Sequence, residues 1–236
     1  MSATRAYPLW RHWLSYLTDQ RLERLSGQHA QHLEVTLRRG SLLLQAEGAV
    51  YSWEDHYYNF REAFAHLDWA ALPGNRVLLL GLGLGSVIQI AEEHFGQVLD
   101  YTAIEYDAVV ARLAERYLLS RLASSVEVVV EDAGRFVQRC TGRFDLILVD
   151  VFVDDRVPEA FETLDYLHKL RGLLTPGGCL ISNRLTYRAT DRADTERYLD
   201  EVFTVVFPRA EVLDVRSNWM LYSDTRFVIE EAALDA

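Results

Sequence analysis

The chain has 236 residues, half of them hydrophobic and a quarter charged, which suits one large α/β body with its own core. Its formal net charge of -11 argues against nucleic acid as a partner, because phosphates repel an acidic surface and no run of Lys or Arg forms a basic patch. The longest apolar run is broken by glycines and is too short to cross a bilayer, so we expect no membrane span. The acidic charge suits a cationic small molecule as substrate.

Two cysteines and the first twenty residues bear on the cellular compartment. Cys140 and Cys179 lack the short spacing of a disulfide framework or a zinc site, so we expect reduced thiols and no bound metal. The first twenty residues mix Arg, His and Asp with apolar residues, unlike a signal peptide. Together these features predict a cytoplasmic protein.

Residues 1–70 are predicted to form a small N-terminal lobe. Apolar residues recur at helical spacing from Pro8 to about Leu25, which predicts an amphipathic helix. We expect its tryptophans, Trp10 and Trp13, to pack against the hairpins, and a dimer contact or a lid is the alternative. The stretch HLEVTLRRGSLLLQAEGAVYSW alternates and turns at Gly40 and Gly48, which predicts two or three antiparallel strands. A second helix, EDHYYNFREAFAHLDW, has an apolar face formed by Tyr57, Phe60, Phe64 and Leu67.

Residues 71–236 are predicted to form a Rossmann-like, doubly wound and mostly parallel sheet. Apolar strands alternate here with amphipathic helices, as βαβ units do. The expected strands are RVLLLG, VLDYTAIE, VEVVVED, FDLILVD and CLISN. Right-handed crossovers place the helices on both faces of the sheet. In the tail, AEVLDV, NWMLYSD and RFVIEE are expected to add strands at the sheet edge.

Three alternating glycines, Gly81, Gly83 and Gly85, follow the first of these strands, where an open α/β sheet binds its ligand. A dinucleotide fingerprint requires G-x-G-x-x-G, but this loop has the spacing G-x-G-x-G, and Ser86 stands where the third glycine belongs. The tight turn suits a nucleoside with a short tail better than a pyrophosphate, which argues against a nicotinamide dehydrogenase. A plain strand-to-helix turn is the alternative.

Three carboxylates, Glu105, Asp132 and Asp150, close the next three strands in turn. Glu105 stands about 20 residues after the loop, where a carboxylate accepts hydrogen bonds from ribose hydroxyls. Asp132, followed by the small Ala133, is placed to accept a hydrogen bond from the amine of adenine. Asp150 is expected at the cleft, where it either orients or deprotonates an acceptor or binds the cofactor. The pattern predicts a site for S-adenosylmethionine or a close relative.

These motifs resemble the spermidine synthase branch of the class I S-adenosylmethionine-dependent transferases. The resemblance covers roughly residues 40–183 and rests on GLGLGS, IEYD, EDA, FDLILVDVF and LLTPGG. That family places a small β lobe before its nucleotide domain, as predicted here. The resemblance implies S-adenosylmethionine or its decarboxylated form as cofactor, a small-molecule acceptor, a cationic one included, and a homodimer. The implied cofactor-binding residues are Gly81, Gly83, Leu84, Gly85, Glu105, Asp132, Ala133 and Asp150.

The chain departs from this family in the acceptor half of the site. The family's glycine loop carries an aspartate that grips the charged tail of decarboxylated S-adenosylmethionine, and Leu84 stands in its place. Of the family's D-S-S-D-P motif, Asp150 is kept, whereas Asp154 and Asp155 are shifted. Tyr58 matches the tyrosine of the family's D-E-x-x-Y-H-E motif. Tyr58, Asp154 and Asp155 are therefore the candidate substrate-binding residues.

These losses bear on the reaction. Each missing partner of a polyamine ammonium is worth about 1–3 kcal/mol, so losing several weakens polyamine binding by about a thousandfold or more. We therefore hypothesise that the chain does not make spermidine efficiently and expect methyl transfer to an unidentified small molecule, with Asp150 as the catalytic residue. Two alternatives stay open: an aminopropyltransferase with a divergent acceptor pocket, and a non-catalytic nucleoside-binding homologue.

Overall fold

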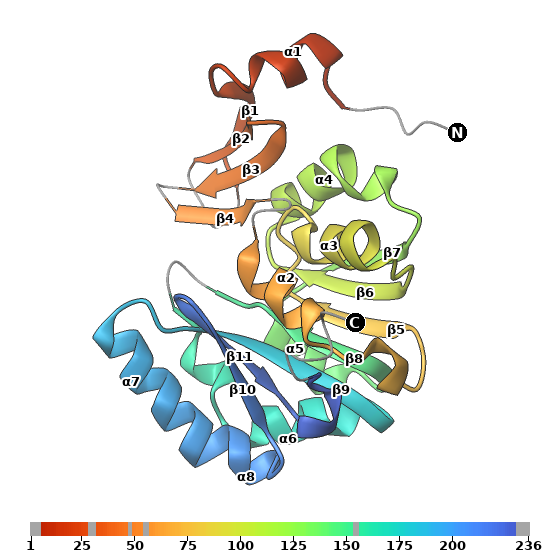
Figure 1. Ribbon diagram of the computed structural model, residues 1–236, viewed down its shortest axis with the longest axis vertical. Helices are drawn as coiled ribbons and strands as arrows, with labels where there is room; N and C mark the ends of the chain where they lie inside the picture. Colours follow the sequence, from red (N-terminus) through yellow and green to blue (C-terminus); the bar gives the residue numbers. More distant parts are fainter. Residues whose placement is uncertain (1–5, 28–31, 47–48, 54–56, 153–155, 230–236) are drawn as a thin grey trace.

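The computed structural model describes residues 6–27, 32–46, 49–53, 57–152 and 156–229 and contains two sheets. One is a four-stranded antiparallel sheet in the order β1-β2-β3-β4, and the other has seven strands in the order β10-β11-β9-β8-β5-β6-β7. Figure 1 shows the small sheet and α1 at one end of the molecule and the large sheet, flanked by helices, at the other.

The N-terminal lobe is a short helix followed by an antiparallel meander. Its elements are α1 Leu9–Leu14, β1 Gln20–Leu25, β2 Leu33–Arg38, β3 Ser41–Ala46 and β4 Ala49–Trp53. The turn between β2 and β3 lies at Arg39 and Gly40, whose φ values of 49° and 86° match the twist of a tight hairpin. The predicted strands are thus present, and β1 precedes them. The second predicted turn, at Gly48, lies outside the described residues.

The predicted helix from Pro8 to Leu25 is wrong in its second half. The helix ends at Leu14, and Gln20–Leu25 forms β1, which pairs antiparallel with β2. Pairing with a neighbouring strand overrides the helical spacing of the apolar residues there. The helix also does not bury its tryptophans, because Trp10 and Trp13 are 58% and 70% exposed. The homodimer that the resemblance implies stays a prediction.

The large domain alternates strands and helices as predicted. Its elements are α2 Tyr58–Ala65, β5 Arg76–Leu80, α3 Ser86–Phe95, β6 Asp100–Glu105, α4 Ala108–Tyr117, β7 Ser125–Val130, α5 Ala133–Arg139, β8 Phe144–Val149, α6 Leu164–Leu173, β9 Leu174–Leu185, α7 Ala189–Tyr198, α8 Thr204–Val206, β10 Glu211–Val215 and β11 Asn218–Tyr222. Strands β5 to β9 run parallel, and β11 and β10 extend the sheet antiparallel at one edge. The predicted fold class is confirmed. Among the described residues, no helix has the length and hydropathy needed to cross a bilayer.

The third strand predicted for the tail, RFVIEE, is wrong. Thr225–Phe227 forms a turn of 3₁₀-helix, and Val228 makes an isolated bridge to Leu67. The carboxylate of Asp224 accepts the backbone N–H of Arg226 at 3.1 Å. That local bond favours a turn over an extended strand.

Helix α2 packs with the large domain rather than with the lobe. Phe60 and Phe64 are buried in the core that covers one face of β5 and β11. The hydroxyl of Tyr222 in β11 donates to the carbonyl of Ala63 at 2.6 Å. The predicted border between the two domains, at residue 70, stays a prediction, and α2 on its N-terminal side packs on the large sheet.

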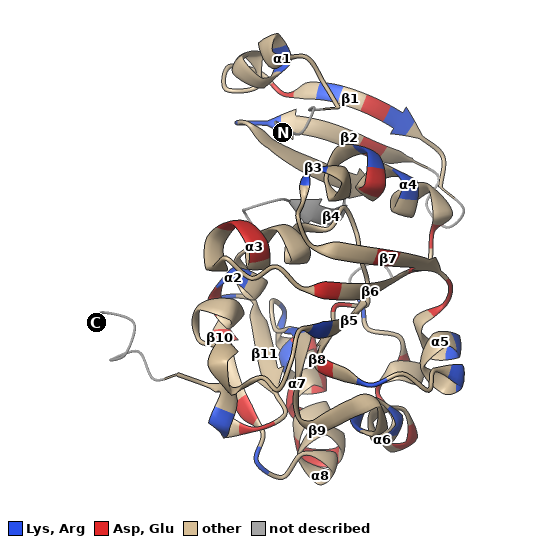
Figure 2. Ribbon diagram, turned by 90° about the vertical axis from the view of Figure 1, so that its right-hand side faces the viewer, with Lys and Arg blue, Asp and Glu red and all other residues tan. Residues whose placement is uncertain are grey.

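The lobe and the large domain share a third core, built around the glycine loop. The side chain of Leu84 is fully buried among residues of the lobe sheet and of α4 (Leu33, Val35, Leu37, Leu42, Leu44, Val109, Val110, Leu113 and Tyr117). Nearby, Arg116 of α4 forms an ion pair with Glu23 of β1 at 3.0 Å. Figure 2 shows acidic and basic residues on both elements. The lobe therefore rests directly on the loop that follows β5.

Leu84 provides a test of this shared core. We expect Leu84→Asp to lower the free energy of unfolding by about 3 kcal/mol or more, because a carboxylate would be buried there without a partner. Leu84→Met keeps the volume and should cost less than about 1.5 kcal/mol. Urea denaturation of both variants measures the difference. Equal midpoints for the two variants would mean that the side chain reaches water.

Candidate functional site

The predicted site residues meet at one edge of the large sheet. Strands β8, β5, β6 and β7 are neighbours in that order, and their register pairs Leu80 with both Val149 and Ile104. Glu105 pairs in turn with Val130. Because the four strands are parallel and end at the same level, Asp150, the glycine loop, Glu105 and Asp132 follow one another along this edge.

The glycine loop touches the end of β8. Gly81 has a φ of 91°, and a Cβ atom there would collide with the carbonyl oxygen of Asp150. Both the backbone angle and the space therefore require glycine at this position. Gly83 and Gly85 also have positive φ values, of 54° and 95°, and α3 begins directly after them. The tight turn expected from the sequence is present.

The structure brings Glu105 and the glycine loop together. One carboxylate oxygen, Oε2, accepts the backbone N–H of Gly83 at 3.1 Å, and the other accepts that of Asp107 at 3.0 Å. Burial raises the pKa of Glu105, and the hydrogen bonds from the backbone lower it in part. Each oxygen has a second lone pair, so this carboxylate fits the hydroxyls of a ribose.

Asp132 and Ala133 lie one strand further along the edge. Oδ1 of Asp132 accepts the N–H of Arg135 at 2.9 Å and so caps α5. Ala133 is buried in the core beneath. The carboxylate therefore has a structural task that the sequence did not show, in addition to its predicted contact with a base.

Leu84 requires a correction. The sequence placed it among the cofactor-contacting residues, but its side chain is 0% exposed and packs into the core shared with the lobe. Any contact that Leu84 makes with a ligand is therefore limited to its backbone. Its neighbour Leu82 is buried as well, in the core beneath the sheet.

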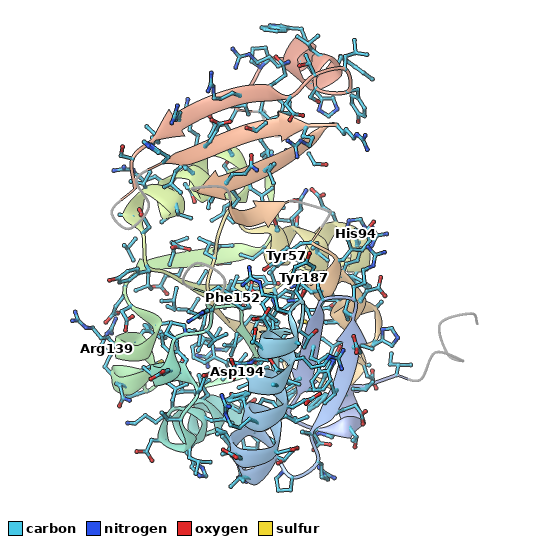
Figure 3. The ribbon with its side chains drawn as sticks, turned by 90° about the vertical axis from the view of Figure 1, so that its left-hand side faces the viewer. Tyr57, His94, Arg139, Phe152, Tyr187 and Asp194 are labelled. Atoms are coloured by element: carbon cyan, nitrogen blue, oxygen red, sulfur yellow. The ribbon has the colours of Figure 1, made fainter. Side chains whose placement is uncertain are left out.

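Asp150 is held by a chain of hydrogen bonds from three elements. The hydroxyl of Tyr57 donates to its Oδ1 and Oδ2 at 3.0 and 2.8 Å. Nδ2 of Asn183 in β9 donates to Oδ1 at 2.9 Å. Nδ2 of Asn218 in β11 then donates to the side-chain Oδ1 of Asn183 at 2.8 Å. Figure 3 shows Tyr57 near the end of the large sheet, below the lobe.

These surroundings adjust the acidity of Asp150. Burial raises its pKa to about 6, against the opposing effect of hydrogen bonds from Asn183 and Tyr57. Burial and the charge of Asp150 in turn raise the pKa of Tyr57 well above its usual value. Tyr57 therefore keeps its proton and acts as a donor. A carboxylate with a pKa near 6 is suited to accepting a proton at neutral pH.

The tyrosine that binds Asp150 is Tyr57, the neighbour of the predicted Tyr58. The ring of Tyr58 is 41% exposed, and the guanidinium of Arg216 lies 4.1 Å from its centroid. The sequence assigned Tyr57 to an apolar helix face and so missed its role. It missed Asn183 as well, although this polar residue lies near the end of the strand next to β8. The other predicted substrate-binding residues, Asp154 and Asp155, lie outside the described residues.

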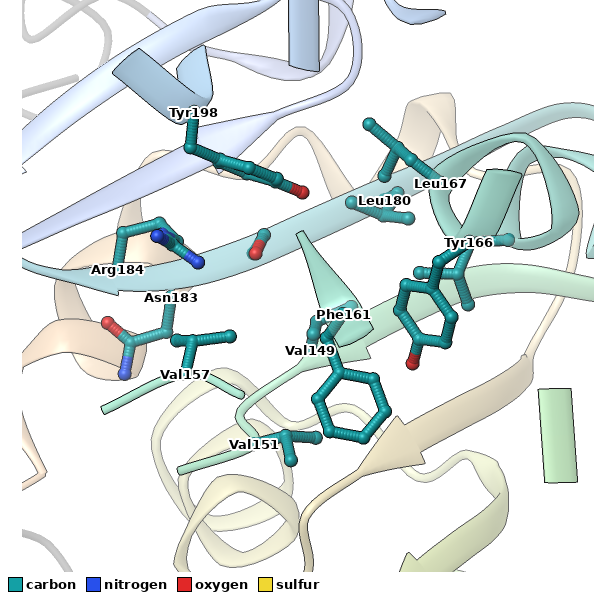
Figure 4. A pocket seen from close by; sticks show the side chains of 12 residues that line it. Val149, Val151, Val157, Phe161, Tyr166, Leu167, Leu180, Asn183, Arg184 and Tyr198 are labelled. Atoms are coloured by element: carbon teal, nitrogen blue, oxygen red, sulfur yellow. The ribbon is translucent and has the colours of Figure 1, made fainter. Parts of the chain in front are cut away.

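A cavity behind this network is too small for an acceptor. It lies between β9, α6 and α7 and has a free volume of about 10 Å³, room for about one water (Figure 4). The buried Arg184 at its wall pairs with Glu162 and stacks on the ring of Tyr198. In the part of the chain that the structure describes, no group of three His, Cys, Asp or Glu is arranged to hold a metal.

Comparisons with known sequences point to one family. A family model described as the spermine/spermidine synthase domain matches residues 58–223. A polyamine aminopropyltransferase of Vibrio vulnificus is 32% identical over 111 residues, which cover 46% of this chain and 37% of that relative. Longer alignments with other aminopropyltransferases reach 55% of their length. The chain thus spans about half the length of these relatives, or less.

Solved structures share the fold. A probable spermidine synthase from Corynebacterium glutamicum superposes with a TM-score of 0.69 and 21% identity, over 85% of this chain and 78% of that one. Human methyltransferase-like protein 13, in complex with SAH, superposes with a TM-score of 0.61 and 21% identity, over 75% and 88%. Because the family model matches most of the large domain, this chain belongs to the spermine/spermidine synthase domain family.

Proposed function

We propose that this chain transfers an aminopropyl group from decarboxylated S-adenosylmethionine to a small amine. The observation that carries the proposal is the partly buried carboxylate of Asp150, which Tyr57 and Asn183 hold beside the glycine loop. The aminopropyltransferases among the relatives support the same reading. They favour the aminopropyl alternative over the methyl transfer expected from the sequence.

The nucleoside of the donor fits the edge of the sheet. The glycine loop, Glu105 and Asp132 would hold it, since the carboxylate of Glu105 lies beside the N–H of Gly83 at the end of β6. When bound, the donor supplies a carbon that is activated by its bond to a sulfonium. The protein then has to align the acceptor amine with that carbon and to receive the proton that the amine nitrogen releases.

Asp150 is the group that receives this proton. Its Oδ1 accepts hydrogen bonds from both Tyr57 and Asn183, whereas Oδ2 accepts one, from Tyr57. Oδ2 therefore has a lone pair for the N–H of an acceptor amine. As the C–N bond forms, the C–S bond of the sulfonium would break and its electron pair would stay on the sulfur of the departing methylthioadenosine. The nitrogen becomes positively charged and releases a proton, which Oδ2 would take up. Tyr57 and Asn183 only donate, so they hold the carboxylate in its ionised form.

The pKa of Asp150 sets the expected pH dependence. Because the carboxylate must be ionised, we expect kcat/KM, referred to the concentration of neutral amine, to rise about tenfold per pH unit up to about pH 6 and to level off above it. Asp150→Asn should remove this limb and lower kcat by about 10²–10⁴-fold. Formation of methylthioadenosine from decarboxylated S-adenosylmethionine and a panel of small amines measures both. Asp100→Asn, which changes an exposed carboxylate of β6, is the control. The same acid limb in Asp150→Asn would contradict the assignment.

Arg216 carries a positive charge next to the residues that flank the hydrogen-bonded chain around Asp150. Arg216 stacks on Tyr58, which is adjacent to Tyr57, and precedes Asn218 by two residues. Both neighbours belong to the hydrogen-bonded chain around Asp150. A second ammonium group of a diamine would be repelled there, so we expect a monoamine to be the better acceptor.

Arg216→Gln tests this charge. We expect the KM for putrescine to fall by about two- to fivefold, the size of an exposed charge interaction, and the KM for a monoamine of the same length to stay unchanged. Arg21→Gln, on the outer strand of the lobe sheet, is the matched control. If the ratio of the KM values for putrescine and the monoamine is the same in Arg216→Gln as in the unchanged protein, the guanidinium does not select the acceptor.

Methyl transfer is the second candidate function, favoured by the buried side chain of Leu84. The resemblance places an aspartate here to grip the ammonium of the decarboxylated donor, and leucine offers no such charge. The two functions differ in product. With both donors supplied, aminopropyl transfer yields methylthioadenosine, and methyl transfer yields S-adenosylhomocysteine. We expect methylthioadenosine. Tight binding of both donors without either product would support the non-catalytic homologue.

A further inference from the structure

Asn183 lies between an acceptor, the carboxylate of Asp150, and a donor, the side-chain amide of Asn218. It is buried, its Nδ2 donates to Asp150, and its Oδ1 accepts from Asn218. An amide group has one donating end and one accepting end. When the oxygen of the Asn183 amide faces Asn218, its NH₂ group faces Asp150, and the reverse. Asn218 therefore determines whether Asp150 faces a donor or an acceptor.

The orientation of Asn218 is in turn set by the turn before β11. The hydroxyl of Ser217 donates to Oδ1 of Asn218 at 3.3 Å, which leaves Nδ2 of Asn218 to donate to Asn183. The three hydrogen bonds, from Ser217 through Asn218 and Asn183 to Asp150, all point toward the carboxylate. Such a chain of aligned donors favours negative charge at its end.

We propose that Asn218 is a positioning residue that keeps Asp150 ionised by fixing the amide of Asn183. The effect on the carboxylate stands on the geometry alone, and its consequence for turnover rests on the proposed function. The other side chain that contacts this carboxylate is Tyr57, just before α2, which donates to it. Two charged residues lie next to this chain of amides in the sequence, Arg184 on β9 and Arg216 in the β10–β11 turn. Both have other contacts, since Arg184 pairs with Glu162 and Arg216 stacks on Tyr58.

Asn218→Asp reverses the chain of donors. The introduced carboxylate only accepts, so the amide of Asn183 must turn to donate to it. Oδ1 of Asn183 then faces Oδ1 of Asp150, and two acceptors meet unless Asp150 carries a proton. The substitution should therefore raise the pKa of Asp150 through the amide, in addition to the direct repulsion between two negative charges.

The experiment is a pH titration of the full chain labelled with ¹³C at the aspartate carboxyl groups, followed by NMR. The signal of Asp150 is the one that Asp150→Asn removes. We expect Asn218→Asp to raise its midpoint by about one to two pH units, the effect of losing a hydrogen bond to a charged group. Asn75→Asp makes the same change at an exposed amide, which donates to Asp100, and should leave the midpoint of Asp150 unchanged.

A double-mutant cycle separates the amide from plain charge repulsion. In Asn183→Leu, which has no amide to turn, adding Asn218→Asp should raise the midpoint by less than half as much. An equal shift in the presence and absence of Asn183 would overturn the proposal, and so would no shift in Asn218→Asp. Asn218→Ala, which only removes the donor, provides a milder variant, with a smaller shift in the same direction expected.

Activity distinguishes this proposal from the proposed function. If Asp150 is the base, the acid limb of kcat/KM in Asn218→Asp moves upward together with the NMR midpoint. If the midpoint moves by the part that depends on Asn183 and the acid limb does not move, the amide acts as proposed, and the role of Asp150 as base is wrong. If neither moves, the proposed role of Asn218 is wrong, whatever the reaction.

Discussion

The close approach of two strand ends, at Gly81 and Asp150, is the constraint on which the site depends. The backbone N–H of Asp150 donates to the carbonyl of Leu80 at 2.8 Å, and no side chain fits at Gly81 between the two backbones. Gly81 also donates to the carbonyl of Ile104 at 3.0 Å, one strand further along. The carboxylate, the glycine loop and Glu105 are thereby held as one unit by main-chain contacts.

That constraint holds the carboxylate of Asp150 where little water reaches it, and neighbouring groups have to replace the hydrogen bonds that water would make. A buried carboxylate without partners is strongly disfavoured, and hydrogen bonds to it recover part of the cost. Here they come from Tyr57 and Asn183, two residues far apart in the sequence. The compensation is incomplete, which is why the pKa of Asp150 lies near 6 rather than at its usual value. An incompletely stabilised carboxylate is one that can take up a proton.

Much of the large domain could be predicted from the sequence, because its strands are continuous apolar runs that end in carboxylates or glycines. Glu105 and Asp150 were found by that rule, since parallel strands end at one edge. The partners of Asp150 were not. Asn183 and Asn218 meet only through the antiparallel pairing of β9 with β11, a long-range register that local patterns do not determine. Tyr57 and Tyr58 are adjacent, and the start of α2 decides which of them reaches Asp150. In the lobe, strand pairing of 20–25 overrode a helical pattern.

The burial of Leu84 against the lobe has a consequence for how this chain can change over evolutionary time. In the glycine loop, the residue that the resemblance assigns to a ligand contact is also a packing residue between two domains. A change of Leu84 to aspartate is therefore not a single neutral step, because Leu37, Leu44 and Leu113 would first have to make room for a charge. A substitution at Leu84 therefore requires matching substitutions in the lobe residues that pack against it. The core shared with the lobe thus limits which side chains this position of the loop can carry, whichever donor the chain uses.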